Sequence, residues 1–135
     1  MTELEKGYVA ALIDGEGTIT LLYQHKNDKF RAPVIEITST TYDMLQKMKD
    51  LIGGSISKIT KKQEHHKQAY KWSITYNKVL VLLEEVKDYL LEPKKKARAE
   101  LLLNEYKEVT PRNGHYTEEK LIRKLNFEKK FFEIE

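Results

Sequence analysis

The fold is decided by the stretch Val9-Ala10-Ala11-Leu12-Ile13-Asp14-Gly15-Glu16-Gly17, which closes the first helical segment of the chain. Small residues recur every three or four positions, at 7, 10, 11 and 15, so one face of the predicted helix has almost no side-chain bulk. The backbone of a second helix can approach that face closely. The helix then ends on two carboxylates, Asp14 and Glu16, with a glycine between them.

These two carboxylates favour a cation site. Two such helices packed side by side would bring their acidic ends together, and like charges in contact are costly unless a divalent cation lies between them. An EF-hand is excluded, because position 12 of such a loop would be His25 instead of a glutamate. No glycine-rich phosphate-binding motif is present. The alternative that Asp14 and Glu16 only end the helix in a polar turn stays open on these residues alone.

Outward from this stretch, hydrophobic periodicity predicts two repeated hairpin-helix units after a first helix over residues 3–14. Thr41 is a candidate N-cap. A terminal helix begins near Thr117 and carries Leu121 and Leu125 on its apolar side, with Phe131-Phe132 as further candidates. The predicted elements are strands 18–24 and 33–39, a helix 41–52, strands 55–60 and 69–75, and helices 79–90 and 94–108.

Alternation within the strands predicts the faces of one sheet. Tyr70, Trp72 and Ile74 share a side that helices must cover, and we also expect Tyr8 in the core. The other side carries polar residues that face solvent or a partner. The expected fold is α+β: an αββαββα core with a four-stranded antiparallel saddle-shaped sheet, helices on one face and extra C-terminal helices. We expect a single domain over 1–135, with the core at about 5–105 and a C-terminal helical extension at about 106–135.

Composition limits the class of protein. The 135 residues include no cysteine, so no disulfide framework or thiolate nucleophile exists. No apolar run approaches the roughly 20 residues of a membrane span, and the polar start lacks the features of a signal peptide. We therefore expect no membrane partner and an intracellular protein, in the cytoplasm of a prokaryote or in an organelle.

Charge is unevenly distributed along the chain, although its net value is only +3. Residues 1–23 hold 1 basic and 4 acidic side chains, whereas residues 24–75 hold 10 basic and 5 acidic ones. A local basic excess attracts a phosphate backbone, but surfaces rich in Lys and Glu also occur in proteins that bind no nucleic acid.

The nonapeptide at 9–17 resembles the signature of the LAGLIDADG homing endonucleases, with alanine for the first glycine and Glu16 for the second acid. Later features follow the family's order and extend the resemblance over about residues 5–105: Ile52-Gly53-Gly54-Ser55-Ile56, Tyr70-Lys71-Trp72, and Tyr89-Leu90-Leu91 followed by Lys94-Lys95-Lys96. The family's core has the αββαββα order predicted above. The resemblance thus implies a site-specific double-strand DNA endonuclease.

The resemblance also implies roles for particular residues. Glu16, with Gly15 beside it, would form a metal site for Mg²⁺, for which Mn²⁺ can substitute. A lysine before the penultimate helix would support catalysis; Lys95 fits best, and the neighbouring lysines at 94 and 96 stay open. Where many relatives have Gln or Asn late in the second strand, this chain has Ser39, whose hydroxyl could hold a water.

A single copy of the motif provides one metal-binding carboxylate, so cutting both strands requires a homodimer. Its interface would contain Gly7, Ala10, Ala11 and Asp14. Two sheets would then lie in the major groove of double-stranded DNA and contact a long, near-palindromic target. The candidate DNA-binding residues are Thr20, Leu22, Gln24, Lys26, Lys29, Arg31, Glu36, Thr38, Lys58, Lys61, Lys67, Lys71, Ser73 and Thr75, of which Lys29, Arg31 and Lys67 are expected phosphate contacts.

Two other classes of function remain. The same scaffold could be a non-catalytic nucleic-acid binder, such as an intron RNA maturase or a DNA-binding regulator. A structural protein with no affinity for nucleic acid is the third possibility, and a gel shift with its salt dependence separates it from the others.

Overall fold

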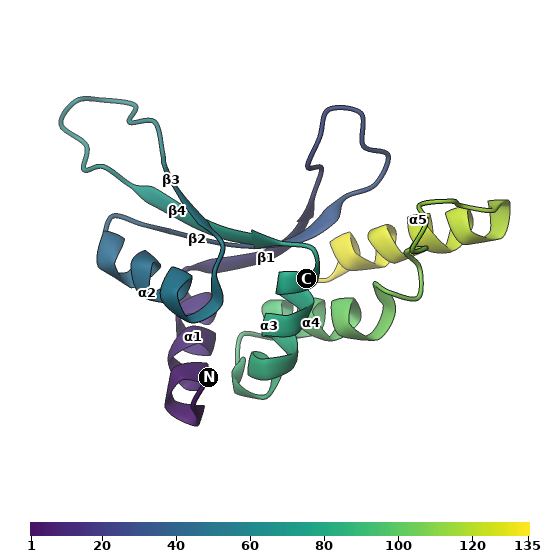
Figure 1. The fold of residues 1–135 in the computed structure, drawn as a ribbon, viewed down its shortest axis with the longest axis horizontal. Helices are drawn as coiled ribbons and strands as arrows, with labels where there is room; N and C mark the ends of the chain where they lie inside the picture. The colour runs from purple at the N-terminus through teal and green to yellow at the C-terminus, as the bar shows by residue number, and fades with distance from the viewer.

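The computed structural model describes all 135 residues and confirms the predicted α+β architecture (Figure 1). Every predicted helix and strand is present, with ends that shift by a few residues. The elements are α1 (Glu3–Glu16), β1 (Gly17–Leu22), β2 (Ala32–Ser39), α2 (Tyr42–Ile52), β3 (Ser55–Lys58), β4 (Tyr70–Thr75), α3 (Asn77–Val86), the 3-10 helix η1 (Lys87–Tyr89), α4 (Pro93–Glu105) and α5 (Glu118–Glu133).

The four strands form one antiparallel sheet in the order β1-β2-β4-β3. One face carries the buried side chains Ile19, Ile35, Ile37, Trp72 and Ile74, which pack on the helices. The opposite face lies open between two long loops, β1–β2 and β3–β4, that rise at opposite ends of the sheet (Figure 1). The molecule therefore presents a concave, polar sheet surface with the helical layer behind it.

Local interactions fix both ends of α1. Thr2 accepts a hydrogen bond from the Glu5 amide, and the Glu5 carboxylate accepts one from the Thr2 amide, which forms a capping box. At the other end, a Cβ atom on Gly17 would lie 2.9 Å from the Cα and O atoms of Ile13. Glycine at 17 therefore lets β1 leave the helix with no spacer, so that α1 runs directly into the sheet.

The predicted helix over 79–90 is interrupted, which corrects the prediction. The α-helix ends at Val86, and the 3-10 helix η1 follows it. Next, the amides of Leu91 and Glu92 donate to the Asp14 carboxylate, and the Glu92 side chain accepts from the first amides of α4. These bonds hold the connection extended and stop the helix from continuing.

Three predicted core positions are wrong. Leu121 and Leu125 are 36% and 53% exposed, because α5 instead buries Phe127 and Phe131 together with a lysine and a glutamate. Tyr8, expected in the core, is 44% exposed on α1.

No helix in the structure combines the length and the apolar character that crossing a membrane requires.

Candidate functional site

The candidate site is built around the C-terminal end of α1, where that helix meets the sheet. Glu16 is the last helical residue and is exposed. None of the protein's ion pairs or side-chain hydrogen bonds involves its carboxylate. A charged group so placed is available to a cation that comes from outside the chain.

Asp14 differs from Glu16 because its carboxylate is engaged within the chain. It accepts hydrogen bonds from the amides of Leu91 at 2.9 Å and Glu92 at 3.2 Å. Asp14, which was expected at the dimer interface, thus holds the α3–α4 connection against α1. Of the two carboxylates in the motif, only Glu16 is unpartnered.

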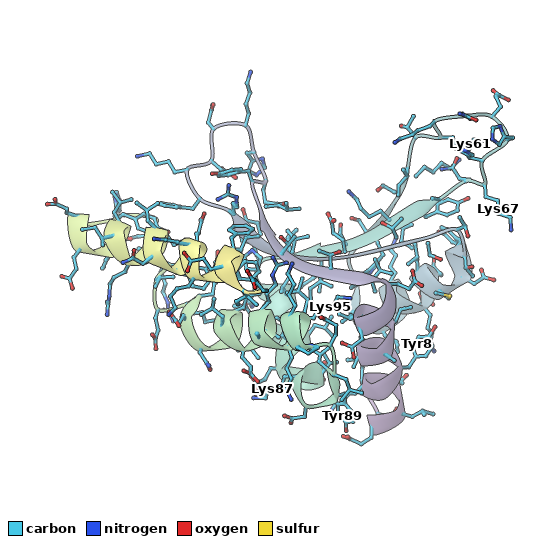
Figure 2. The ribbon with its side chains drawn as sticks, turned by 180° about the vertical axis from the view of Figure 1, so that it is seen from behind. Tyr8, Lys61, Lys67, Lys87, Tyr89 and Lys95 are labelled. Carbon is cyan, nitrogen blue, oxygen red and sulfur yellow. The ribbon has the colours of Figure 1, made fainter.

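Lys95 is the one lysine of the triple-lysine run that reaches the end of α1. Its Nζ atom donates to the carbonyl oxygens of Asp14 at 2.6 Å and Ile13 at 3.0 Å, while Lys94 and Lys96 are exposed. Figure 2 shows Lys95 beside the upper end of α1. A cation at a helix C-terminus neutralises the partial negative charge of the last carbonyls. An ammonium group has three protons, so one remains for a water or a phosphate.

The outward face of α1 bears little side-chain bulk, but the residues on it differ in part from those predicted. Ala10 is fully buried in the core of its own chain, so it does not lie on that face. The outward stripe consists instead of the exposed residues Leu4, Tyr8, Ala11 and Gly15 with the half-buried Gly7, and it spans the length of the helix. A Cβ atom at Gly7 or Gly15 would meet nothing within 4 Å. Packing within this chain therefore does not require glycine at either position.

The open face of the sheet carries most of the predicted polar side chains. Lys58 is an exception that corrects the prediction, because it pairs with Tyr70 in β4 and so lies on the helix-covered side of the sheet. The strand register aligns Thr18, Glu36, Ser73 and Ser55 across all four strands. Lys71 forms an ion pair with Glu36 at 3.6 Å on this face. Exposed or half-buried positions hold Thr20, Leu22, Gln24, Lys26, Lys29, Glu36, Thr38, Lys58, Lys61, Lys67, Lys71, Ser73 and Thr75.

Arg31 and Ser39 are further predicted site residues that have partners inside the chain. Arg31, expected on a phosphate, donates through Nη1 to the Glu128 carboxylate at 2.8 Å, and its amide donates to the other oxygen of that carboxylate at 3.0 Å. One nitrogen of its guanidinium group is therefore engaged by Glu128. Ser39 accepts through Oγ from the Thr41 amide at 2.9 Å, so this oxygen closes the turn into α2.

Arg98 belongs to the same region, although sequence reasoning did not identify it. It lies one turn beyond Lys95 on α4, and its Nη1 atom donates to the Ile19 carbonyl oxygen at 2.7 Å. Burial lowers the pKa of Arg98. Lys95 and Arg98 together tie α4 to both sides of the α1–β1 junction. The sequence signal that could have identified Arg98 is its spacing: a basic residue three positions after Lys95 lies on the same face of the helix.

The donors at the α1 end fit half of a divalent cation site. Oxygen atoms are the ligands that Mg²⁺ prefers, and Glu16 offers an unpartnered carboxylate. No group of three or more His, Asp or Glu side chains forms in the protein. One chain thus supplies a single free carboxylate at this point.

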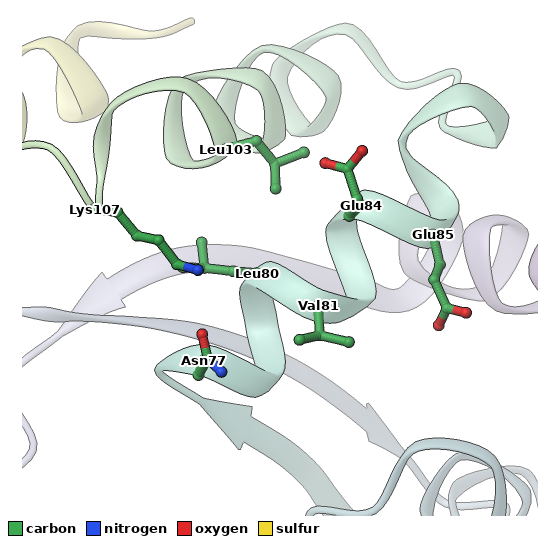
Figure 3. A pocket seen from close by; sticks show the side chains of 7 residues that line it. All are labelled: Asn77, Leu80, Val81, Glu84, Glu85, Leu103 and Lys107. Carbon is green, nitrogen blue, oxygen red and sulfur yellow. The ribbon is translucent and has the colours of Figure 1, made fainter.

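A groove of about 490 Å³ lies elsewhere, between α3 and α4 (Figure 3). It is lined by Asn77, Leu80, Val81, Glu84, Glu85, Leu103 and Lys107, and it contains none of the candidate site residues.

Solved structures with the same fold include several homing endonucleases. I-CvuI, in complex with a DNA target in the presence of Mg, superposes with a TM-score of 0.74 at 16% identity, over 98% of this chain and 83% of that one. The archaeal intron-encoded I-Vdi141I, complexed with DNA, gives 0.65 at 16% identity, over 98% and 85%. I-SmaMI bound to cleaved DNA gives 0.67 at 19% identity, over 90% of this chain but only 42% of that one.

No curated protein matches the sequence. The model of the LAGLIDADG endonuclease family matches residues 9–109, which is most of the chain and includes the second half of α1, the whole sheet and helices α2 to α4. With this match, the chain belongs to the LAGLIDADG endonuclease family.

Proposed function

We propose that the protein is a site-specific double-strand DNA endonuclease that acts as a homodimer with a divalent metal ion. The observation that carries the proposal is the unpartnered Glu16 carboxylate at the end of a helix whose outward face leaves room for a second helix. Family membership supports the nuclease activity.

The α1 stripe supports dimerisation by a second copy of this chain. Leu4 is 84% exposed and Tyr8 is 44% exposed, so the stripe offers apolar surface, while Gly7, Ala11 and Gly15 offer close approach. A two-fold axis beside α1 would bring both Glu16 carboxylates together. The match to 42% of the I-SmaMI chain fits this arrangement, because one copy here is about the size of half of that protein.

The open sheet face and its two loops support a DNA partner. Hydroxyl, amide and ammonium groups on this face can bond to base edges in a major groove. Lys61 and Lys67 lie on the β3–β4 loop, far above the sheet, where they could bind phosphates that flank the bases (Figure 2). DNA is present in the similar I-CvuI and I-Vdi141I structures. With a target in the host's own DNA, we also propose that the protein acts inside the cell, in a prokaryotic cytoplasm or an organelle.

Glu16 of each copy, with Gly15 beside it, would hold Mg²⁺, and Mn²⁺ would substitute because it accepts the same oxygen ligands. When bound, the metal supplies Lewis acidity for phosphodiester hydrolysis. Lys95 would keep the last turn of α1 in place through its bonds to Ile13 and Asp14, and its remaining proton would face the water or the phosphate. Ser39 can donate its hydroxyl proton to a water, since its oxygen only accepts from Thr41.

The experiment is selection of cleaved sites from a randomised DNA duplex library with Mg²⁺, followed by sequencing of the cut ends. The proposal predicts one recurrent site with near two-fold symmetry and no cutting in EDTA. Binding of a recurrent site without any cleavage would instead identify a non-catalytic DNA binder. Splicing of a host intron without DNA cleavage would identify a maturase.

A further inference from the structure

The two loops that flank the open face differ in how they are held. Side chains of α5 and of the segment before it contact the β1–β2 loop, over residues 23–31. In the β3–β4 loop, over residues 59–69, only Gln68 makes side-chain hydrogen bonds, and these go to Ile59 and Ala69 within the loop. None of that loop's side-chain hydrogen bonds or ion pairs reaches a helix.

A buried carboxylate on α5 is the centre of the first set of contacts. Glu128 is only 6% exposed, and it accepts from both the backbone amide and the guanidinium group of Arg31. The pair joins residues 97 positions apart in the chain. Arg31 ends the loop and precedes β2, so Glu128 fixes the base of the loop directly.

Aromatic groups extend this anchor on either side of Arg31. The guanidinium carbon lies 4.4 Å from the ring centre of Tyr23, at the start of the loop, and 5.0 Å from that of Phe132 on α5. Arg31 therefore links both ends of the loop to one face of α5. Cation–π contacts of this kind add to the ion pair when they are partly desolvated.

Phe30 supplies a further contact. Its ring centre lies 4.7 Å from that of Tyr116, which precedes α5, and 5.8 Å from Nζ of the buried Lys124. Within the loop, the Asp28 carboxylate accepts from the amides of Gln24 at 3.2 Å and His25 at 2.9 Å. The loop is thus closed on itself at the tip and fixed to α5 at the base.

We propose that α5 is a positioning element that presets the β1–β2 loop for base recognition, with Glu128 and Arg31 as its positioning residues. The inference rests on the proposed function, because it assumes that the open face binds DNA. A preordered loop loses little conformational entropy on binding and holds its side chains in one register against the bases. The β3–β4 loop, with Lys61, Lys62 and Lys67, would then contribute affinity that depends little on sequence.

The test compares Glu128→Gln and Arg31→Met with Glu105→Gln as a matched control. Glu105 on α4 also accepts from an α5 lysine, Lys130 at 2.7 Å, but it does not contact the loop. The first measurement is amide hydrogen exchange of the free protein. Loss of the charged bond to Arg31 should raise exchange over residues 23–31 by about tenfold or more, since such bonds contribute about 1.5–3 kcal/mol. Exchange over 59–69 should stay unchanged, as should all exchange in Glu105→Gln.

The second measurement uses the DNA site selected by the wild-type protein. Glu128→Gln and Arg31→Met should each lose about tenfold in discrimination against altered base pairs beneath the β1–β2 loop. Both variants should keep the wild-type affinity for a DNA duplex of random sequence. The double variant Glu128→Gln/Arg31→Met should lose no more than either single variant, because both changes break one contact.

The outcomes distinguish this inference from the proposed function. Unchanged exchange over 23–31 in both variants overturns the inference even if the protein cuts DNA. Raised exchange with undiminished discrimination also overturns it. If the wild-type protein neither binds nor cuts DNA, the proposed function is wrong, and so is the role of the β1–β2 loop in base recognition. The exchange measurement then still decides whether α5 orders that loop. Should Glu128→Gln not fold, Arg31→Met decides alone.

Discussion

Lys95 Nζ lies 2.6 Å from the carbonyl oxygen of Asp14, so an ammonium group from α4 closes the last turn of the helix that presents Glu16. The Asp14 carboxylate returns the contact by accepting from amides just before α4. The end of α1 and the start of α4 therefore form one rigid unit, so a substitution in one should alter the position of the other.

Replacing Lys95 by Met should lower the cleavage rate at saturating DNA by at least about tenfold, because it removes the cation that holds the end of the helix presenting Glu16. Lys94→Met and Lys96→Met are the matched controls, since both lysines are exposed in the same helical turn. Single-turnover cleavage separates the effect on rate from any loss of DNA binding. Equal rates for all three variants would mean that Lys95 only supports the fold.

Two glycines of the first helical segment should respond oppositely to alanine. Gly7→Ala should raise the free energy of monomer unfolding by about 0.5–1 kcal/mol, because alanine favours a helix and its Cβ meets nothing within 4 Å. Gly17→Ala should lower it by about 1–3 kcal/mol, since its Cβ would lie 2.9 Å from Ile13. Urea denaturation at low protein concentration measures both, and effects of the same sign would contradict the described packing.

The α1 stripe predicts the oligomeric state. Ala11→Glu puts a charge on the small outward face and should yield monomers in analytical ultracentrifugation, while the wild-type protein sediments as a dimer. Val81→Glu is the control, because Val81 is 58% exposed but lies on α3 in the groove of Figure 3. A dimer that survives Ala11→Glu and dissociates with Val81→Glu would place the interface on α3.

Lys124 predicts a pH dependence of stability. Burial lowers its pKa from 10.5 to about 8, and the charge of Glu128 opposes that shift. Between these pH values the unfolded chain binds more protons, so the free energy of unfolding should rise as the pH rises from 8 toward 10. Burial raises the pKa of Tyr106 and Tyr116 above 10, so their opposite effect falls outside this window.

Urea denaturation of the wild-type protein and of Lys124→Met across this pH range measures the effect. The variant should lose the rise, while Lys129→Met, which removes a well-exposed lysine of the same helix, should keep it. A wild-type stability that falls from pH 8 to 9.5 would refute the assignment to Lys124.

Much of the fold follows from the sequence, because its signals are local. Apolar and polar residues alternate along the strands, and the glycines at 17, 53 and 54 mark where helices end. Trp72 was correctly placed in the core, and its indole donates to the Gly53 carbonyl oxygen at 2.8 Å. The face of α5 was predicted only in part: Phe131 is buried as expected, but Lys124 and Glu128 take the place of Leu121 and Leu125. The partner of Arg31 could not be predicted, because a sequence shows its charge but not its contact with Glu128, 97 positions later. Ala10 shares the spacing of the small residues, yet only tertiary packing decides which of them turn inward.

Glu16 is proposed as the metal-binding carboxylate of a DNA endonuclease, and the Glu16→Gln variant is the sharpest test of that role. The measurement is Mg²⁺-dependent cleavage of the selected DNA site, with binding of the same duplex measured in Ca²⁺ as the control for folding. Glutamine keeps the size of the side chain and removes the charge. The account predicts normal binding of the duplex with cleavage reduced to background, and cleavage at the wild-type rate by Glu16→Gln would contradict it.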